Sequence, residues 1–198
     1  EEAAVIQAVA ARPYVGRGAL KLVHALGVWP VQVEGRTVLD IGSSTGGFTE
    51  VCLLHGAARV YAVDVGRGQL HPKLAGDPRV VSLEGVDARN LTPALIPMAP
   101  DLIVTDVSFI GLAKALPVGL ALAARGADLV ALVKPQFEVG PDQVGKGGLV
   151  KDEAARGRAL EEVSAFLTVS GGLVRATSDS PISGGDGNHE YLLWAQKA

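Results

Sequence analysis

Two apolar runs, each carrying an aspartate near its end, flank a glycine-rich turn, and this unit constrains the fold more than any other feature. The first run covers 37–41 and carries Asp40, and the second covers 59–64 and ends at Asp64. An open parallel sheet presents such a turn at the carboxyl ends of its strands, where glycine lets the backbone approach a ligand closely. An acid about twenty residues beyond the turn can accept hydrogen bonds from both hydroxyls of a ribose. The pattern predicts a protein that holds an adenosine-containing cofactor.

The spacing of the glycines favours one cofactor. A dinucleotide site requires G-x-G-x-x-G, but Ser44 occupies the place of the middle glycine. The loop has the form G-x-x-x-G-G, and its hydroxyl groups suit the zwitterionic tail of S-adenosylmethionine better than a phosphate. Such turns also occur in α/β folds without a ligand, and the acid at Asp64 is what favours a nucleoside site. The expected cofactor contacts are Asp40, Gly42, Ser43, Ser44, Thr45, Gly46, Gly47, Phe48, Asp64 and Val65, with Asp87 as a hydrogen-bond acceptor for the adenine amino group or, equally, a solvated turn acid.

The alternation of apolar runs and helical patterns predicts a doubly wound α/β sheet. The last two runs are joined by a turn-rich segment without a helix, so we expect them to pair antiparallel. This is the architecture of a Rossmann-like methyltransferase, a mostly parallel seven-stranded sheet with an antiparallel last strand and helices on both faces. Strands are expected near 37–41, 59–64, 79–83, 101–105, 128–133, 172–177 and 190–195, and helices near 18–28, 46–55, 66–75, 108–125 and 153–170.

Composition restricts the class of protein further. The chain has 198 residues, enough for one domain, and its 48% of hydrophobic residues exclude a disordered chain. We expect 1–30 to be a segment and helix that lead into a catalytic domain at 31–198. The single Cys52 lies in a helical pattern and predicts a buried thiol in a reducing compartment. Because neither a transmembrane segment nor a signal peptide is recognisable, we expect a cytoplasmic protein without stable membrane association.

Charge and histidine spacing limit the partners. A net charge of −3 gives no global attraction to nucleic acid, so RNA binding must rest on local patches, whose alternative reading is a solvated charged face. The four histidines lack metal-ligand spacing, so no metal is expected. The two basic clusters are Arg12, Arg17 and Lys21 beside Tyr14, and Lys134, Lys146, Lys151, Arg156 and Arg158.

Reactive side chains are expected where strands end. Asp106 and Lys134 each follow an apolar run, so both project toward the edge that carries Asp64. A lysine between such a run and a proline is partly buried and loses its charge more easily, especially beside a second cation such as Lys21. It can accept the proton of a hydroxyl or stabilise the developing alkoxide. A lysine that only caps a strand is the simpler alternative, and spacing alone would leave Glu190 as a surface residue.

Several motifs together resemble a known family. They are Tyr14-Val15-Gly16-Arg17-Gly18-Ala19-Leu20-Lys21, the loop from Asp40 to Thr49, Asp106-Val107-Ser108-Phe109-Ile110, Leu132-Val133-Lys134-Pro135-Gln136-Phe137-Glu138 and Gly187-Asn188-His189-Glu190. From about residue 12 to the end, the chain resembles the TlyA-type branch of the FtsJ-like RNA methyltransferases. The combination is far more specific than any single motif.

The resemblance implies an activity and a site. Enzymes of this family carry a Lys-Asp-Lys-Glu tetrad for methylation of a ribose 2′-hydroxyl, which implies Lys21, Asp106, Lys134 and Glu190 here. The branch acts on cytidines of ribosomal RNA, so the expected partners are ribosomal RNA or ribosomal subunits. Its members normally begin with an S4-type RNA-binding domain, which nothing in this sequence resembles, so we expect the catalytic part of a longer protein.

Three other functions fit single features of the sequence. The segment 140–147 nearly matches a phosphate-binding loop, but Gly147 replaces the serine or threonine that ligates Mg²⁺, and no strand directly precedes it. A membrane-active haemolysin is suggested only by an older label of the branch, and the helix expected at 153–170 is neither clearly basic nor amphipathic. An RNA-binding module that keeps the fold without catalysis is the last alternative, and loss of activity in Lys134→Ala would argue against it.

Overall fold

The structure, a computed structural model, describes residues 14–198 of the chain, which form one seven-stranded sheet in the order β3-β2-β1-β4-β5-β7-β6. Strands β1 to β5 are parallel, and β7 runs antiparallel to β5 and to β6. The predicted architecture is confirmed. Arg12 of the first basic cluster lies outside the described residues. The strands are β1 (Thr37–Ile41), β2 (Arg59–Asp64), β3 (Val80–Glu84), β4 (Leu102–Thr105), β5 (Asp128–Val133), β6 (Gly172–Asp179) and β7 (Tyr191–Lys197).

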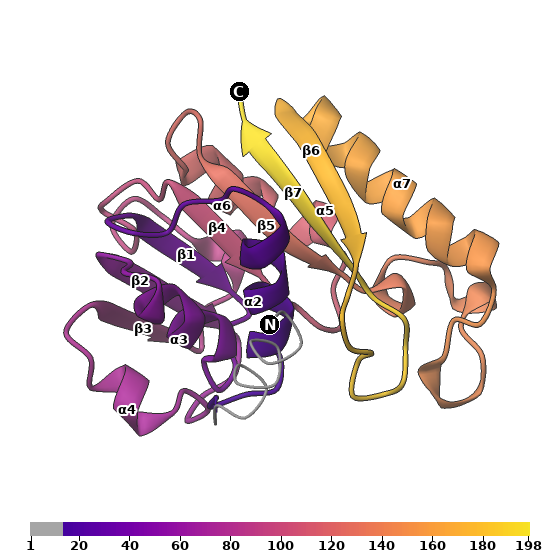
Figure 1. The fold of residues 1–198 in the computed structure, drawn as a ribbon, viewed down its shortest axis with the longest axis horizontal. Helices are drawn as coiled ribbons and strands as arrows, with labels where there is room; N and C mark the ends of the chain where they lie inside the picture. Colours follow the sequence, from indigo (N-terminus) through magenta and orange to yellow (C-terminus); the bar gives the residue numbers. More distant parts are fainter. Residues whose placement is uncertain (1–13) are drawn as a thin grey trace, which may run out of the picture.

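Helices cover both faces of the sheet because alternate strand residues point to opposite sides. One face packs against α2 (Ala19–Val28) and α3 (Gly47–Leu54), as Figure 1 shows. The other packs against a layer that includes α7 (Glu153–Val169). Strand β1 shows the division, since Val38 belongs to the first core and Leu39 to the second, and both are fully buried. The central strands β1, β4 and β5 are therefore covered on both sides, and their carboxyl ends are the place where a ligand can reach the sheet.

Two predicted helices are shorter than their patterns suggest. Only α4 (Pro72–Ala75) forms within 66–75, because Gly68 adopts a positive φ of 68° and proline favours the first turn of a helix. The stretch 108–125 divides into α5 (Leu112–Ala115) and α6 (Pro117–Leu122). Pro117 has no N–H to donate and begins the second helix, while Phe109, with φ of 65°, keeps the start of the stretch out of helical geometry.

Loops at the carboxyl edge complete the chain. The segments between β5 and α7 and between β6 and β7 both lie at this edge, at the bottom of the view in Figure 1. The first holds three short turns of 3-10 helix, η2 (Pro135–Phe137), η3 (Pro141–Gln143) and η4 (Lys146–Gly148), rather than a strand that leads into a helix. Within residues 14–198, none of the helices has the length and apolar character needed to span a bilayer.

Candidate active site

A cleft of about 930 Å³ opens at the carboxyl edge of the parallel strands. Its walls include Asp64 at the end of β2, Val65 after it, Asp87 after β3 and Asp106 after β4. A second cavity of about 210 Å³ adjoins it and shares Gly42, Ser44 and Asp106 with the cleft. The predicted cofactor residues Ser43, Thr45, Gly47 and Phe48 line this smaller cavity, whereas Asp40 and Gly46 line neither.

Two glycines of the loop occupy positions that no other residue fits. Gly42 has φ of 83°, and a Cβ atom there would overlap the carbonyl oxygen of Asp106. Gly46 has φ of 106°, and a Cβ atom would overlap the side chain of Leu74. Both positive φ values lie in the region that L-residues with a side chain avoid. The glycine pattern therefore lets the β1 loop pack directly on the segment after β4.

We expect Gly42→Ala to lower the free energy of unfolding by about 3 kcal/mol or more, because it combines an unfavourable φ with a backbone overlap. Gly35→Ala is the matched control, since Gly35 has φ of 75° but no atom within 4 Å of an added Cβ. That variant should lose only about 1 to 2 kcal/mol. Urea unfolding of both variants measures the difference, and equal losses would show that the overlap with Asp106 is not important.

Asp64 shapes the loop as well as the cleft. Its Oδ2 accepts a hydrogen bond from the Ser44 N–H at 2.8 Å, and its Oδ1 accepts one from the Gly66 N–H at 2.8 Å. An ionised carboxylate has about four lone-pair sites, so each oxygen keeps one for another donor. Asp64 can therefore accept two ribose hydroxyls while holding the loop in place.

Asp40 is fully buried beneath this loop. Its Oδ2 accepts a hydrogen bond from the Thr49 hydroxyl at 2.6 Å, and its Oδ1 has no partner. Burial raises the pKa of Asp40 to about 7, the hydrogen bond from Thr49 opposes this shift, and the negative charges of Asp106 and Asp64 add to it. The folded protein thus binds a proton at Asp40 that the unfolded chain releases above pH 4.

This burial predicts a pH dependence of stability. Since the pKa of Asp40 rises on folding from 3.8 to about 7, its ionisation costs roughly 4 kcal/mol of stability between pH 4 and pH 7. Asp40→Asn, which cannot ionise, should lack this loss and be the more stable protein at pH 8. Urea unfolding of both proteins from pH 4 to pH 8 gives the difference in slope, up to about 1.4 kcal/mol per pH unit. If the unfolding free energies of the two proteins changed equally with pH, this effect of Asp40 would be contradicted.

Asp87 presents a different environment. Both of its carboxylate oxygens accept hydrogen bonds from the Arg89 guanidinium, and Oδ1 also accepts the Arg89 backbone N–H at 2.8 Å. These hydrogen bonds from Arg89 lower the pKa of Asp87 to about 2. Asp87 is therefore an ionised acceptor on the wall of the cleft.

The four residues of the expected tetrad form two ion pairs. Lys134 Nζ lies 2.6 Å from Asp106 Oδ1, and Lys21 Nζ lies 2.6 Å from Glu190 Oε1. Both partners of the second pair are buried, with side-chain exposures of 8% and 2%. A buried pair loses its hydration and needs this close geometry to be stable. The structure therefore confines two lysines and two acids to fixed positions near the cleft.

The sheet brings the two pairs together. In the antiparallel ladder between β5 and β7, Val133 lies opposite Tyr191. Lys134, just after β5, and Glu190, just before β7, therefore leave the sheet at the same edge. A Cβ atom on Gly18, one turn before Lys21 in the chain, would lie 3.2 Å from Asp106 Oδ2. Four segments far apart in the sequence thus converge at one edge.

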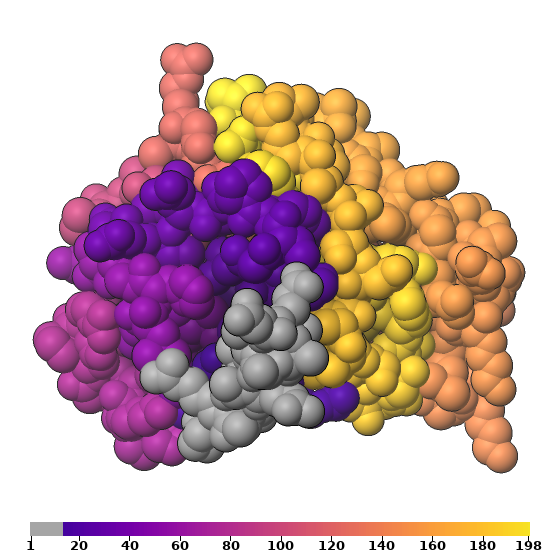
Figure 2. All heavy atoms as spheres, viewed as in Figure 1, coloured from indigo at the N-terminus to yellow at the C-terminus, as the bar shows by residue number. Residues whose placement is uncertain are grey.

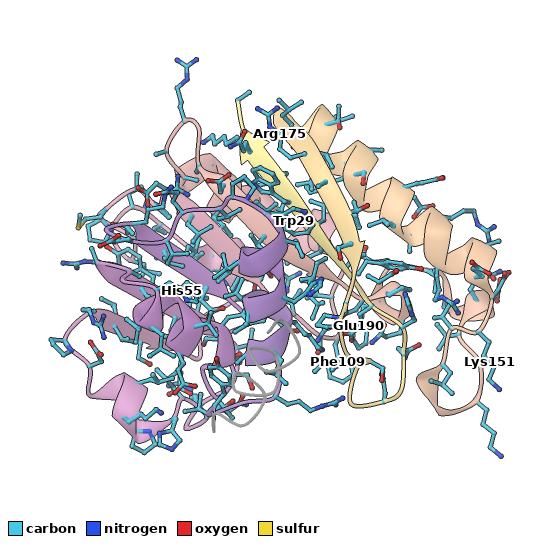
Figure 3. The ribbon with its side chains drawn as sticks, viewed as in Figure 1. Trp29, His55, Phe109, Lys151, Arg175 and Glu190 are labelled. Carbon is cyan, nitrogen blue, oxygen red and sulfur yellow. The ribbon has the colours of Figure 1, made fainter. Side chains whose placement is uncertain are left out.

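Figures 2 and 3 show the same convergence. In Figure 2 the indigo surface near the N-terminus meets the gold surface of the C-terminal part of the chain. Arg17 donates a hydrogen bond to the Ser183 carbonyl at 3.2 Å. Figure 3 places Glu190 and Phe109 at the same end of the sheet. Lys151, in contrast, points away from the molecule. Lys151 of the second basic cluster therefore does not join the tetrad.

Sequence reasoning missed the groups that hold these segments together. Asn188 is buried and contacts another loop, since its Oδ1 accepts the Val150 N–H at 2.9 Å and its Nδ2 donates to the Gly148 carbonyl at 2.9 Å. Ser108 Oγ accepts a hydrogen bond from Lys134 Nζ at 3.1 Å. Both residues stand inside the motifs quoted above, but nothing in their spacing showed which partners they meet. Cys52 is buried as predicted, and burial raises the pKa of its thiol.

A mostly parallel seven-stranded sheet with an antiparallel β7 and a glycine-rich loop after β1 is the architecture of the Rossmann-like methyltransferases. Residues 14–197 match the sequence profile of the FtsJ-like methyltransferase family. The 16S/23S rRNA (cytidine-2′-O)-methyltransferase TlyA of Mycobacterium tuberculosis is 52% identical over 183 residues, which cover 92% of this chain and 68% of that protein. The chain belongs to the FtsJ-like methyltransferase family.

Solved structures of other proteins share the fold of this chain. A candidate hemolysin from Streptococcus thermophilus superimposes with a TM-score of 0.91 at 45% identity, covering 94% of this chain and 68% of that chain. Aeropyrum pernix fibrillarin, in complex with S-adenosyl-L-methionine, shares the fold alone, with a TM-score of 0.63 at 17% identity over 90% of this chain and 76% of its own. The predicted family, fold, enzyme class and cofactor are confirmed.

Proposed function

We propose that this chain transfers a methyl group from S-adenosylmethionine to the ribose 2′-hydroxyl of a cytidine in ribosomal RNA. The arrangement of Lys134 beside Asp106, with the buried pair of Lys21 and Glu190 at the same edge, carries this proposal. The 52% identity to a cytidine-2′-O-methyltransferase supports the substrate. We further propose that the protein acts in the cytoplasm.

The residues of the loop and cleft suit the proposed cofactor. The loop after β1 has no Cβ atom at Gly42, where one would overlap the neighbouring backbone, and the two adjoining cavities together can enclose a nucleoside and an amino-acid tail. Asp64 would accept hydrogen bonds from the ribose hydroxyls, and Asp87 would accept one from the adenine amino group. The hydroxyl groups around Ser44 would form hydrogen bonds with the amino-acid tail of the cofactor. When bound, the cofactor supplies a methyl group that is already activated by a positively charged sulfur.

The lysine and acid side chains would handle the proton and the developing charge of the 2′-hydroxyl. Lys134 would accept the proton of the 2′-hydroxyl or stabilise the alkoxide as it forms. The Lys134 nitrogen lies 2.6 Å from Asp106, which lines the cleft, so this ion pair would keep the nitrogen close to the bound substrate. Glu190 orients Lys21, whose positive charge adds to the field around the developing alkoxide. Alignment of the hydroxyl with the methyl group supplies much of the rate enhancement.

Transfer of labelled methyl from S-adenosylmethionine tests this function. The substrates are ribosomal subunits and naked ribosomal RNA, and alkaline hydrolysis of the product locates the label. A 2′-O-methyl group protects the adjacent phosphodiester, so the label is expected in alkali-resistant dinucleotides. Cofactor binding without labelled RNA would contradict catalysis by this chain.

A further inference from the structure

Lys134 has a second neighbour besides Asp106. Its Nζ lies 2.6 Å from Asp106 Oδ1 and 3.1 Å from Ser108 Oγ. Both acceptors come from the segment that follows β4, and both line the cleft of about 930 Å³. The side chain of Lys134 is only 12% exposed, so these two groups supply its nearest polar surroundings.

The two contacts of the Lys134 nitrogen differ in kind. The nitrogen is tetrahedral, and one of its four directions is the bond to Cε. Ser108 accepts a hydrogen bond along one of the other three. Asp106 Oδ1 lies at ion-pair distance but has no hydrogen-bond partner, so it attracts the charge without occupying an N–H direction. The hydrogen bond to Ser108 therefore sets the directions in which Lys134 presents its lone pair or its other N–H groups.

Asp106 alone would not fix this direction. Asp106 attracts the amino group without a directed hydrogen bond, so the group would stay free to rotate about the bond between Cε and Nζ. Because general bases act only within hydrogen-bond reach of the proton, such rotation lowers the share of productive encounters. The Ser108 hydroxyl removes that freedom.

Neighbouring contacts also fix the position of Ser108 relative to Lys134. The next residue, Phe109, has φ of 65°, and its ring packs on Phe137 with 5.1 Å between ring centroids. Nearby, the Leu112 N–H donates to Glu138 Oε1 at 2.9 Å. These contacts fasten the segment after β4 to the segment that directly follows Lys134, so the hydroxyl and the amine keep their relative positions.

We propose that Ser108 is a positioning residue that orients the Lys134 amino group toward the 2′-hydroxyl. The proposal rests on the proposed function, since it names a further residue that serves the same reaction. Ser108 acts through Lys134 and needs no contact of its own with the RNA. A solvated serine with an incidental hydrogen bond is the competing explanation, and it requires no effect on turnover.

Steady-state kinetics separates these explanations. Ser108→Ala should lower kcat for methylation of ribosomal RNA about 10- to 100-fold, with the dissociation constant for S-adenosylmethionine within twofold of wild type. Ser108→Thr, which keeps the hydroxyl, should recover most of the loss. Ser170→Ala, at the end of α7, is the control and should match wild type. A Ser108→Ala enzyme within twofold of wild type, or a threonine variant as slow as the alanine variant, would overturn the proposal.

A second measurement needs no methyl transfer. Acylation of lysines by a small activated ester, followed by mass spectrometry of peptides, gives the reaction rate of Lys134 relative to the exposed Lys151. Release from Ser108 should raise that ratio severalfold in Ser108→Ala, and an unchanged ratio would overturn the proposal. If the ratio rises but the wild-type protein methylates no RNA, the orientation of Lys134 stands and the proposed function fails.

Discussion

Lys134→Ala is expected to reduce methyl transfer about a thousandfold, because removal of a positioned proton-transfer group typically costs between about 10² and 10⁴ in rate. The affinity for S-adenosylmethionine should stay within about twofold, since Lys134 is held by Asp106 and Ser108 rather than by the β1 loop. Single-turnover transfer of labelled methyl to ribosomal RNA, together with calorimetric titration of the cofactor, measures both quantities.

Two further variants sharpen this prediction. Lys134→Arg keeps the positive charge but cannot give up a proton near neutral pH, so partial activity in this variant would indicate alkoxide stabilisation rather than proton abstraction. Lys151→Ala removes a lysine that points away from the molecule and should leave transfer within twofold of wild type. A Lys134→Ala enzyme that keeps more than a tenth of wild-type activity would contradict the assignment.

The second large effect is expected at Asp64. Asp64→Ala should weaken cofactor binding about 100-fold, because two hydrogen bonds from ribose hydroxyls to a charged acceptor together contribute about 3 kcal/mol. It also removes the acceptor of the Ser44 and Gly66 N–H groups, so the β1 loop loses support at the same time. Calorimetric titration with S-adenosylmethionine measures the change.

The control for Asp64 is another aspartate at the end of a turn. Asp77 is bound by its neighbour Arg79 and lines neither cavity. Asp77→Ala should therefore bind the cofactor as wild type does. A loss of less than threefold in Asp64→Ala would contradict the ribose site, and equal losses in both variants would show that the effect comes from general destabilisation.

The sheet could be predicted from the sequence because its strands are short, apolar and separated by strong turn signals. The antiparallel β7 followed from the absence of a helix between 178 and 190, which leaves a hairpin as the simplest connection. The helices at 66–75 and 108–125 were overestimated for the opposite reason. There the apolar spacing favours a helix, but glycine, proline and the left-handed Phe109 decide the backbone.

Only part of the candidate site could be predicted from the sequence. Asp106 and Lys134 follow strands, so their edge of the sheet is predictable from position alone. Glu190 lies 169 positions from Lys21, and no local pattern predicts that the two form a buried pair. The packing of α2 on the sheet face that carries Leu192 brings Lys21 to Glu190, and this packing exists only in the folded protein. The contact of Ser108 with Lys134 likewise depends on how two loops pack.

The position of the transferred methyl group tests the central claim most directly. RNA methylated by this protein can be digested to nucleosides and analysed by mass spectrometry, with unmethylated ribosomal RNA and the Lys134→Ala reaction in parallel. The account predicts 2′-O-methylcytidine, with the added mass on the ribose fragment, in the wild-type reaction alone. A methyl group on the base, or on a nucleoside other than cytidine, would contradict it.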